Sequence, residues 1–163
     1  MDKRTSKIDY YLNIADTVSD RSTCLRRRYG AIIVRNDEII STGYNGAPRG
    51  RRNCTDIGSC MRDVLNIPSG ERYELCRSVH AEANAIISAA RRDMLGGTLY
   101  LTGRYSKTGE ICSDTTPCSM CRRLIINAGI KEVIARRADG EVVRTHVRDW
   151  VFNDESMEHL KNV

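Results

Sequence analysis

Two short segments, residues 80–82 and 117–121, carry side chains that could bind a metal ion. His80 begins the first segment, and Cys118 and Cys121 lie three residues apart in the second. Neutral imidazole and thiolate are good zinc ligands, and three protein ligands leave one position open for water, as in catalytic zinc sites. On a helix, the two cysteines would project from the same face. These residue types therefore predict a catalytic zinc ion.

Glu82 lies two residues after the histidine, close enough to act on a water at the open position without binding the metal. His-x-Glu followed by Pro-Cys-x-x-Cys is the signature of zinc-dependent deaminases, in which the glutamate moves protons. Zinc lowers the pKa of its water from about 15.7 to about 7. At about 1.36 kcal/mol per pKa unit, this favours hydroxide by on the order of 12 kcal/mol.

We therefore expect Glu82 to accept a proton from this water and pass it to the ring nitrogen beside an amine-bearing carbon, so that the amine leaves as ammonia. Both zinc-binding segments begin predicted helices, whose N-termini favour thiolate and hydroxide. The alternative is a closed structural zinc site in which Glu82 is a solvated helix residue.

The composition is that of a globular protein with a moderate excess of positive charge. The 163 residues fit one domain, predicted over residues 1–163, with 40% apolar and 29% charged residues. No apolar run is long enough to span a membrane, and no secretory segment follows the N-terminus, so we expect a cytoplasmic protein. In that compartment, seven cysteines indicate metal ligands before disulfides.

Much of the net charge of +5 comes from arginines in segments 26–28 and 49–52. The planar guanidinium offers paired donors to phosphate, so these segments fit a phosphorylated small substrate as well as nucleic acid. Solvated arginines on an exposed face account for most of them equally well.

Hydrophobic periodicity predicts a mixed order of helices and strands. Helices are expected over residues 6–19, 59–66, 80–92 and 118–128, with a terminal helix or arm over 150–160. Strands are expected over residues 30–35, 38–42, 98–102, 131–135 and 141–147. Helix 80–92 is apolar nearly all round and should lie in the interior. A hairpin followed by β-α-β crossovers predicts an α/β fold, a three-layer αβα sandwich with a five-stranded mixed sheet.

These motifs, with two further segments, resemble the cytidine and deoxycytidylate deaminase superfamily, and within it the deoxycytidylate (dCMP) deaminases. The matching segments are Gly43-Tyr44-Asn45-Gly46, residues 76–86 around the histidine, and residues 117–130, which end in Asn-Ala-Gly-Ile. The zinc motif identifies only the superfamily, whereas the other two segments are more particular to the dCMP branch. The resemblance implies the αβα deaminase sandwich and hydrolysis of dCMP to dUMP in pyrimidine deoxynucleotide metabolism.

The resemblance also implies partners and a substrate residue. Family members are commonly homo-oligomers, often hexamers, and many are activated by dCTP and inhibited by dTTP near the loop Gly43–Gly46. Such a regulatory nucleotide would bring Mg²⁺ as a further cofactor. An asparagine at the position of Asn45 binds the substrate sugar and base in the family, although Asn-Gly is also a common turn pair. Tyr44 could stack on a base or pack at an interface. Segment 103–114 departs from the shorter family pattern by lengthening the approach to the catalytic cysteines.

Four cysteines precede the catalytic histidine: Cys24, Cys54, Cys60 and Cys76. A four-thiolate zinc site is closed and structural, and would tie the irregular region 49–79 to the first helix and to the catalytic helix. Some dCMP deaminases that the chain resembles carry a second zinc in this area. Alternatively, these cysteines are small buried apolar residues. Cys112 remains as a packed or exposed thiol in either case.

Two other functions fit the zinc motif. A deaminase acting on a base within RNA or DNA, such as a tRNA adenosine deaminase, shares the chemistry, and the basic loops could bind a backbone. With 6% aromatic residues, however, the chain offers few stacking platforms for bases. A non-catalytic zinc nucleic-acid-binding module would leave Glu82 without a role. The residues do not distinguish a monophosphate from a nucleoside or triphosphate substrate, and do not identify the arginine that binds phosphate.

Overall fold

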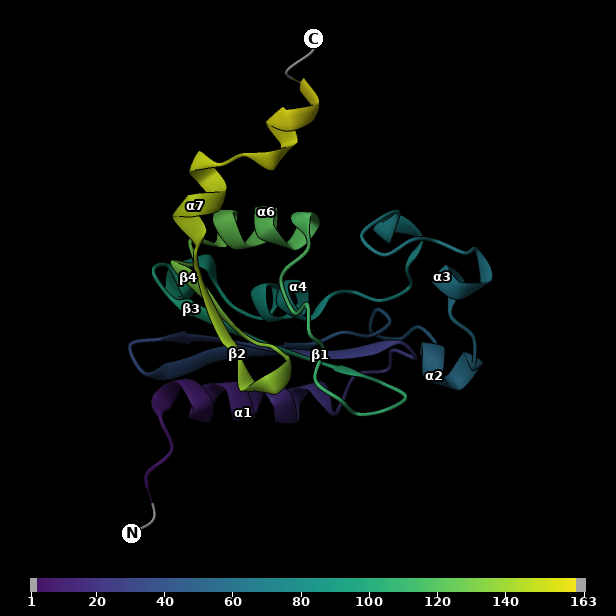
Figure 1. The fold of residues 1–163 in the computed structure, drawn as a ribbon, viewed down its shortest axis with the longest axis horizontal. Coiled ribbons are helices and arrows are strands. Elements are labelled where there is room, and N and C mark those ends of the chain that lie inside the picture. Colours follow the sequence, from purple (N-terminus) through teal and green to yellow (C-terminus); the bar gives the residue numbers. More distant parts are fainter. Residues whose placement is uncertain (1–2, 161–163) are drawn as a thin grey trace.

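The computed structural model describes residues 3–160 and contains one five-stranded sheet between two layers of helices (Figure 1). Its strand order is β2-β1-β3-β4-β5, and β3 and β4 are the parallel pair among otherwise antiparallel neighbours. The strands are β1 (Arg27–Arg35), β2 (Glu38–Tyr44), β3 (Thr98–Tyr105), β4 (Glu132–Arg136) and β5 (Val142–His146). The mixed sheet predicted from the sequence is confirmed.

Helix α1 (Lys7–Ser19) covers one face of the sheet, and α4 (Ala81–Ile87) and α6 (Ser119–Ala128) cover the other (Figure 1). Successive residues of β1 point to opposite faces of the sheet, each of which carries a hydrophobic core. Ile32 packs with α1, whereas Ile33 lies in the core on the side of α4 and α6. The shorter helices are α2 (Cys54–Ile57), α3 (Met61–Val64), α5 (Arg91–Met94), α7 (Val147–Phe152) and the 3₁₀ turns η1 (Tyr73–Leu75), η2 (Ala138–Gly140) and η3 (Glu155–Leu160). The αβα sandwich is confirmed. Within residues 3–160, no helix is both long and apolar enough to cross a membrane.

The predicted helix over residues 80–92 is wrong in length and in burial. α4 ends at Ile87, and α5 begins only at Arg91. The hydroxyl of Ser88 donates to the carbonyl of Asn84, and Ala90 has extended backbone, so the chain leaves the helical path there. Because α4 packs on the sheet with one face, Ile87 remains 70% exposed instead of lying in the interior.

Several other elements differ in extent from the sequence prediction. β1 and β3 are longer because their antiparallel ladder continues until Arg27 pairs with Tyr105, which takes β3 into the predicted excursion. The helix predicted over residues 59–66 is limited to α3, and the terminal helix predicted over 150–160 is instead α7 followed by η3. α2 was not predicted, although Asn53 and Asp56 form a capping box at its start.

Gly43 allows β2 to pack directly against α4. A Cβ atom at this position would lie 2.3 Å from the carbonyl oxygen of Ala81 and 2.4 Å from the backbone nitrogen of Ala85. Both are helix backbone atoms, so the helix itself would have to shift. We expect Gly43→Ala to lower the free energy of unfolding by about 1–3 kcal/mol, the usual cost of overpacking. Urea denaturation of the purified variant measures this change.

The matched control is Thr42→Ala, on the exposed face of the same strand. It should change the free energy of unfolding by about 0.5 kcal/mol or less. Equal effects of the two substitutions would show that the close approach of β2 and α4 is unimportant for stability.

Candidate active site

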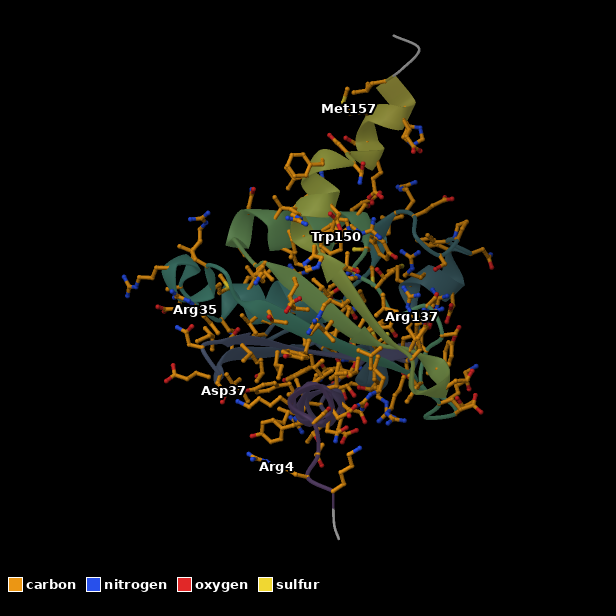
Figure 2. The ribbon with its side chains drawn as sticks, turned by 60° about the vertical axis from the view of Figure 1, so that its left-hand side comes forward. Arg4, Arg35, Asp37, Arg137, Trp150 and Met157 are labelled. Carbon is orange, nitrogen blue, oxygen red and sulfur yellow. The ribbon has the colours of Figure 1, made fainter. Side chains whose placement is uncertain are left out.

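A cavity opens at the end of the sheet where β1 begins and β2 ends. Arg35 and Asp37 mark the opposite end of the sheet, at the β1–β2 turn, and Arg137 lies near the cavity end (Figure 2). The residues that line the cavity come from four regions of the chain and include Tyr29, Asn45, Tyr73, His80, Glu82 and Cys118. The fold therefore brings both predicted zinc-binding segments to one cavity.

Helices α4 and α6 position the three predicted metal ligands. His80 and Cys118 are the N-cap residues of α4 and α6, and Cys121 lies in the first turn of α6. The Nδ1 atom of His80 lies 3.4 Å from the Sγ atom of Cys118 and 3.4 Å from that of Cys121. Tetrahedral zinc, with bonds of about 2.0–2.3 Å, requires nitrogen–sulfur separations of about 3.6 Å. The donor set fits zinc in both chemistry and spacing.

Within residues 3–160, this is the one group of three or more His, Cys, Asp or Glu side chains whose ligand atoms all lie within 4.8 Å of one another. The thiol of Cys121, the His80 imidazole and the Cys121 N–H stabilise the Cys118 thiolate against the opposing effect of burial, so that the pKa of Cys118 falls to about 4. The adjacent Cys118 sulfur and burial raise the pKa of Cys121. One thiolate is thus already favoured before any metal binds.

Glu82 lies in the first turn of α4 with only 5% of its surface exposed, and it lines the same cavity as His80 and Cys118. Burial raises the pKa of its carboxyl group. A carboxyl group with a raised pKa both accepts and releases a proton more readily near neutral pH than an exposed one. This environment suits a group that moves protons.

Most of the hydrogen bonds that the Asn45 side chain can form are made with the protein itself. Its side-chain oxygen accepts from the Ser22 hydroxyl and the Tyr29 N–H, both at 2.7 Å, and its amide nitrogen donates to the Arg27 carbonyl at 2.9 Å. Among the described residues, this leaves one N–H of the amide for a ligand in the cavity. Asn45 therefore holds the start of β1 against the end of β2, and a direct substrate contact stays a prediction.

Tyr73 and Arg62 form one wall of the cavity, although no motif in the sequence indicates either residue. The Tyr73 ring meets the His80 imidazole edge to face, with ring centroids 4.9 Å apart. The Arg62 guanidinium lies 4.8 Å from the centre of the Tyr73 ring. Both residues belong to the irregular region 49–79, where the sequence predicted only a short helix over residues 59–66 and no motif indicated that either side chain reaches the cavity.

The four cysteines that precede His80 gather in one region without forming a compact ligand set. Cys24 and Cys76 line the cavity, whereas Cys54 and Cys60 lie at the starts of α2 and α3. Burial raises the pKa of Cys54 most, and the nearby thiols of the other three cysteines raise it further. No three of these thiols lie within 4.8 Å of one another in the described structure. Cys112 is fully buried.

Comparison with known proteins supports this reading of the site. The family model described as the cytidine and deoxycytidylate deaminase zinc-binding region matches residues 5–136. The deoxycytidylate deaminase of Schizosaccharomyces pombe is 36% identical over 131 residues, which is 80% of this chain and 37% of that protein. The deoxycytidylate deaminase of Mycobacterium phage D29 is 36% identical over 130 residues, 77% of this chain and 91% of the relative.

A solved structure shares the fold. The dCMP deaminase of cyanophage S-TIM5, crystallised with dCMP and dUMP, is 27% identical, with a TM-score of 0.55 over 83% of this chain and 85% of that one. The chain thus spans less than half of the length of the Schizosaccharomyces pombe relative and most of the length of the two phage relatives. With the His-Cys-Cys cluster beside the cavity that the buried glutamate lines, the chain belongs to the cytidine and deoxycytidylate deaminase zinc-binding family.

Proposed function

We propose that this chain catalyses the hydrolytic deamination of dCMP to dUMP. The observation that carries the proposal is the convergence of His80, Cys118 and Cys121 at zinc-ligand spacing beside the buried carboxyl of Glu82. Two of the relatives described above are deoxycytidylate deaminases, and the cyanophage dCMP deaminase was crystallised with dCMP and dUMP. A closed structural site is disfavoured because two of the three ligands, His80 and Cys118, line a cavity.

In the proposed reaction, His80, Cys118 and Cys121 hold the zinc ion, and Glu82 moves the protons. When bound, zinc supplies the acidity that makes water a nucleophile at neutral pH. Glu82 takes one proton from the attacking water and delivers it to N3 of the cytosine ring as oxygen bonds to C4. It then carries the remaining hydroxyl proton to the exocyclic amine. The C4–N4 bond breaks, ammonia leaves, and one water is consumed for each uracil ring formed.

The assay that tests this function measures ammonia release from the zinc-loaded protein with dCMP, deoxycytidine, dCTP and tRNA in parallel. We expect release from dCMP. Release from tRNA alone would favour a base deaminase, the second function that the motif allows. Nucleic-acid binding without ammonia release from any substrate would favour the non-catalytic zinc module.

We also propose that Cys24, Cys54, Cys60 and Cys76 bind a second, structural zinc. The support is that Cys24, Cys60 and Cys76 lie near enough to raise the pKa of Cys54, and that such a site would hold together the irregular chain between α2 and α4. Binding would have to draw the thiols closer together, because no three of them lie within 4.8 Å of one another in the described structure. Metal analysis of the active protein should give two zinc ions per chain. Cys60→Ser, at a position outside the catalytic cavity, should lower this to one and reduce the melting temperature.

Cys112→Ala serves as the control for Cys60→Ser, because Cys112 does not belong to either cluster, and it should keep both ions. A fully active wild-type protein with a single zinc would contradict the second site.

Assembly and regulation remain predictions. Ile87 on α4 and Leu124 on α6 are exposed apolar side chains on the face opposite α1, and they support a homo-oligomer, with a hexamer as the family pattern. Gly43 packs against α4, so substitutions there would confuse a regulatory effect with a structural one. Activation by dCTP with Mg²⁺ and inhibition by dTTP are better tested kinetically on the unaltered protein.

A further inference from the structure

Three arginines line the catalytic cavity, Arg26, Arg27 and Arg62, and Glu82 is the one acidic residue among the lining residues in the described structure. The proposed substrate joins a base, which must reach Glu82, to a phosphate that carries up to two negative charges. The phosphate therefore needs a cationic partner away from the metal ligands. The hydrogen bonds of the three arginines show which of them has donors to offer.

Arg62 has its donors engaged. The side chain is buried, with 5% exposure, and its two terminal nitrogens donate to the carbonyls of Glu71 at 2.7 Å and Pro68 at 2.6 Å. Its guanidinium also lies over the Tyr73 ring. A phosphate could recruit Arg62 only by breaking the bonds that hold this wall of the cavity. We therefore assign Arg62 a structural role.

Arg27 is engaged as well. Its Nη1 atom lies 2.9 and 3.1 Å from the two carboxylate oxygens of Asp114 and 3.2 Å from the Tyr29 hydroxyl. The guanidinium also lies 5.1 Å from the centre of the Tyr105 ring. All of these polar contacts go through Nη1, and in the described structure Nε and Nη2 of Arg27 have no protein partner. The Asp114 carboxylate at 2.9 Å offsets the charge, and the contacts with Tyr29 and Tyr105 fix the position of the guanidinium.

Arg26 is the least constrained of the three arginines. Within residues 3–160, its side chain has one polar contact, 3.4 Å from Nε to a carboxylate oxygen of Asp63, whose side chain is 61% exposed. This leaves the two terminal nitrogens of the guanidinium without a protein partner in the described structure. The backbone, in contrast, is held: its N–H donates to Cys24 Sγ at 3.4 Å, and its carbonyl accepts from Ser106 N–H at 3.0 Å. Arg26 thus combines an anchored backbone with an available guanidinium.

We propose that Arg26 binds the phosphate group of the pyrimidine nucleoside monophosphate, and so makes the site select a monophosphate over the free nucleoside. This inference rests on the proposed deaminase function and names the side chain that recognises the phosphate. The guanidinium donates paired N–H bonds to two phosphate oxygens. The hydroxyl group of Ser78, which lines the same cavity, is a further donor within the site.

The test compares dCMP with deoxycytidine, which lacks the phosphate. Arg26→Gln should raise KM for dCMP about 10- to 100-fold, the size expected for lost charge-assisted hydrogen bonds, with kcat changed little. The kcat/KM for deoxycytidine should stay within about twofold of the wild-type value, because no bond to that substrate is lost. Calorimetric binding of the product pair dUMP and deoxyuridine should show the same contrast.

Arg51→Gln is the matched control. It removes the same charge from an exposed arginine that does not line the cavity, and should leave both substrates unaffected. Suppose that the wild-type protein deaminates dCMP, but Arg26→Gln raises KM for dCMP and deoxycytidine equally, or for neither. This inference is then overturned, while the proposed function stands. A wild-type protein that deaminates deoxycytidine but not dCMP overturns both the inference and the proposed function. Circular dichroism melting of each variant confirms that the fold is retained.

Discussion

Glu82→Gln is expected to bind zinc and fold like the unaltered protein while its turnover falls by at least about a thousandfold, within the range for loss of a general acid–base group. Glutamine has the size of glutamate, so the first turn of α4 and the adjacent ligand His80 should keep their places. Its amide, however, cannot take up the proton of the attacking water. The measurements are the rate of ammonia release from dCMP and the zinc content of the same sample.

Two features of the structure sharpen this prediction. Burial raises the pKa of the Glu82 carboxyl, so a neutral side chain in its place should not lower the melting temperature. Glu38→Gln makes the same chemical change at an exposed position at the start of β2, next to the hairpin turn, and should leave turnover unaffected. A Glu82→Gln protein that keeps a tenth or more of the wild-type rate would assign the proton transfer to another group.

The convergence of the three proposed metal ligands could be predicted because each lies at the start of a helix that the sequence marks clearly. Cys118 and Cys121 are spaced for one helical face, and the apolar pattern that follows is that of α6. His80 likewise immediately precedes α4. Their convergence follows from the two helices packing on the same face of the sheet, and crossover connections make that arrangement the expected one.

The other side chains around the proposed metal site could not be predicted, because hydrogen bonds to other parts of the chain determine their positions. Arg62 is placed by carbonyl oxygens of the irregular chain, and backbone acceptors are the same whatever the residue type. Asn45 could be identified by resemblance as a substrate residue, yet its amide is used mainly to join two strands. In both cases the functional meaning of the residue depends on hydrogen bonds that no local pattern in the sequence records.

Cys121→Ala should abolish zinc binding at the catalytic site. It should also lower kcat/KM by at least about a thousandfold, because the bound metal is what activates the water. The side chain is fully buried and lies 3.4 Å from His80 Nδ1, so no solvent molecule has easy access to replace the lost sulfur ligand. Added zinc should restore the chelator-treated wild type but not this variant. Zinc content, ammonia release and the melting temperature before and after chelation measure these effects.

Cys112→Ala is the control that separates metal binding from packing, because Cys112 is buried to the same extent and lies outside the ligand cluster. Both substitutions remove a buried sulfur, which costs on the order of 1–2 kcal/mol in the free energy of unfolding. Cys121→Ala should in addition lose the stabilisation that bound metal gives the folded state. Chelation should therefore lower the melting temperature of wild type and Cys112→Ala more than that of Cys121→Ala. Equal sensitivity of all three to chelation, with activity retained in Cys121→Ala, would mean that the catalytic metal is held elsewhere.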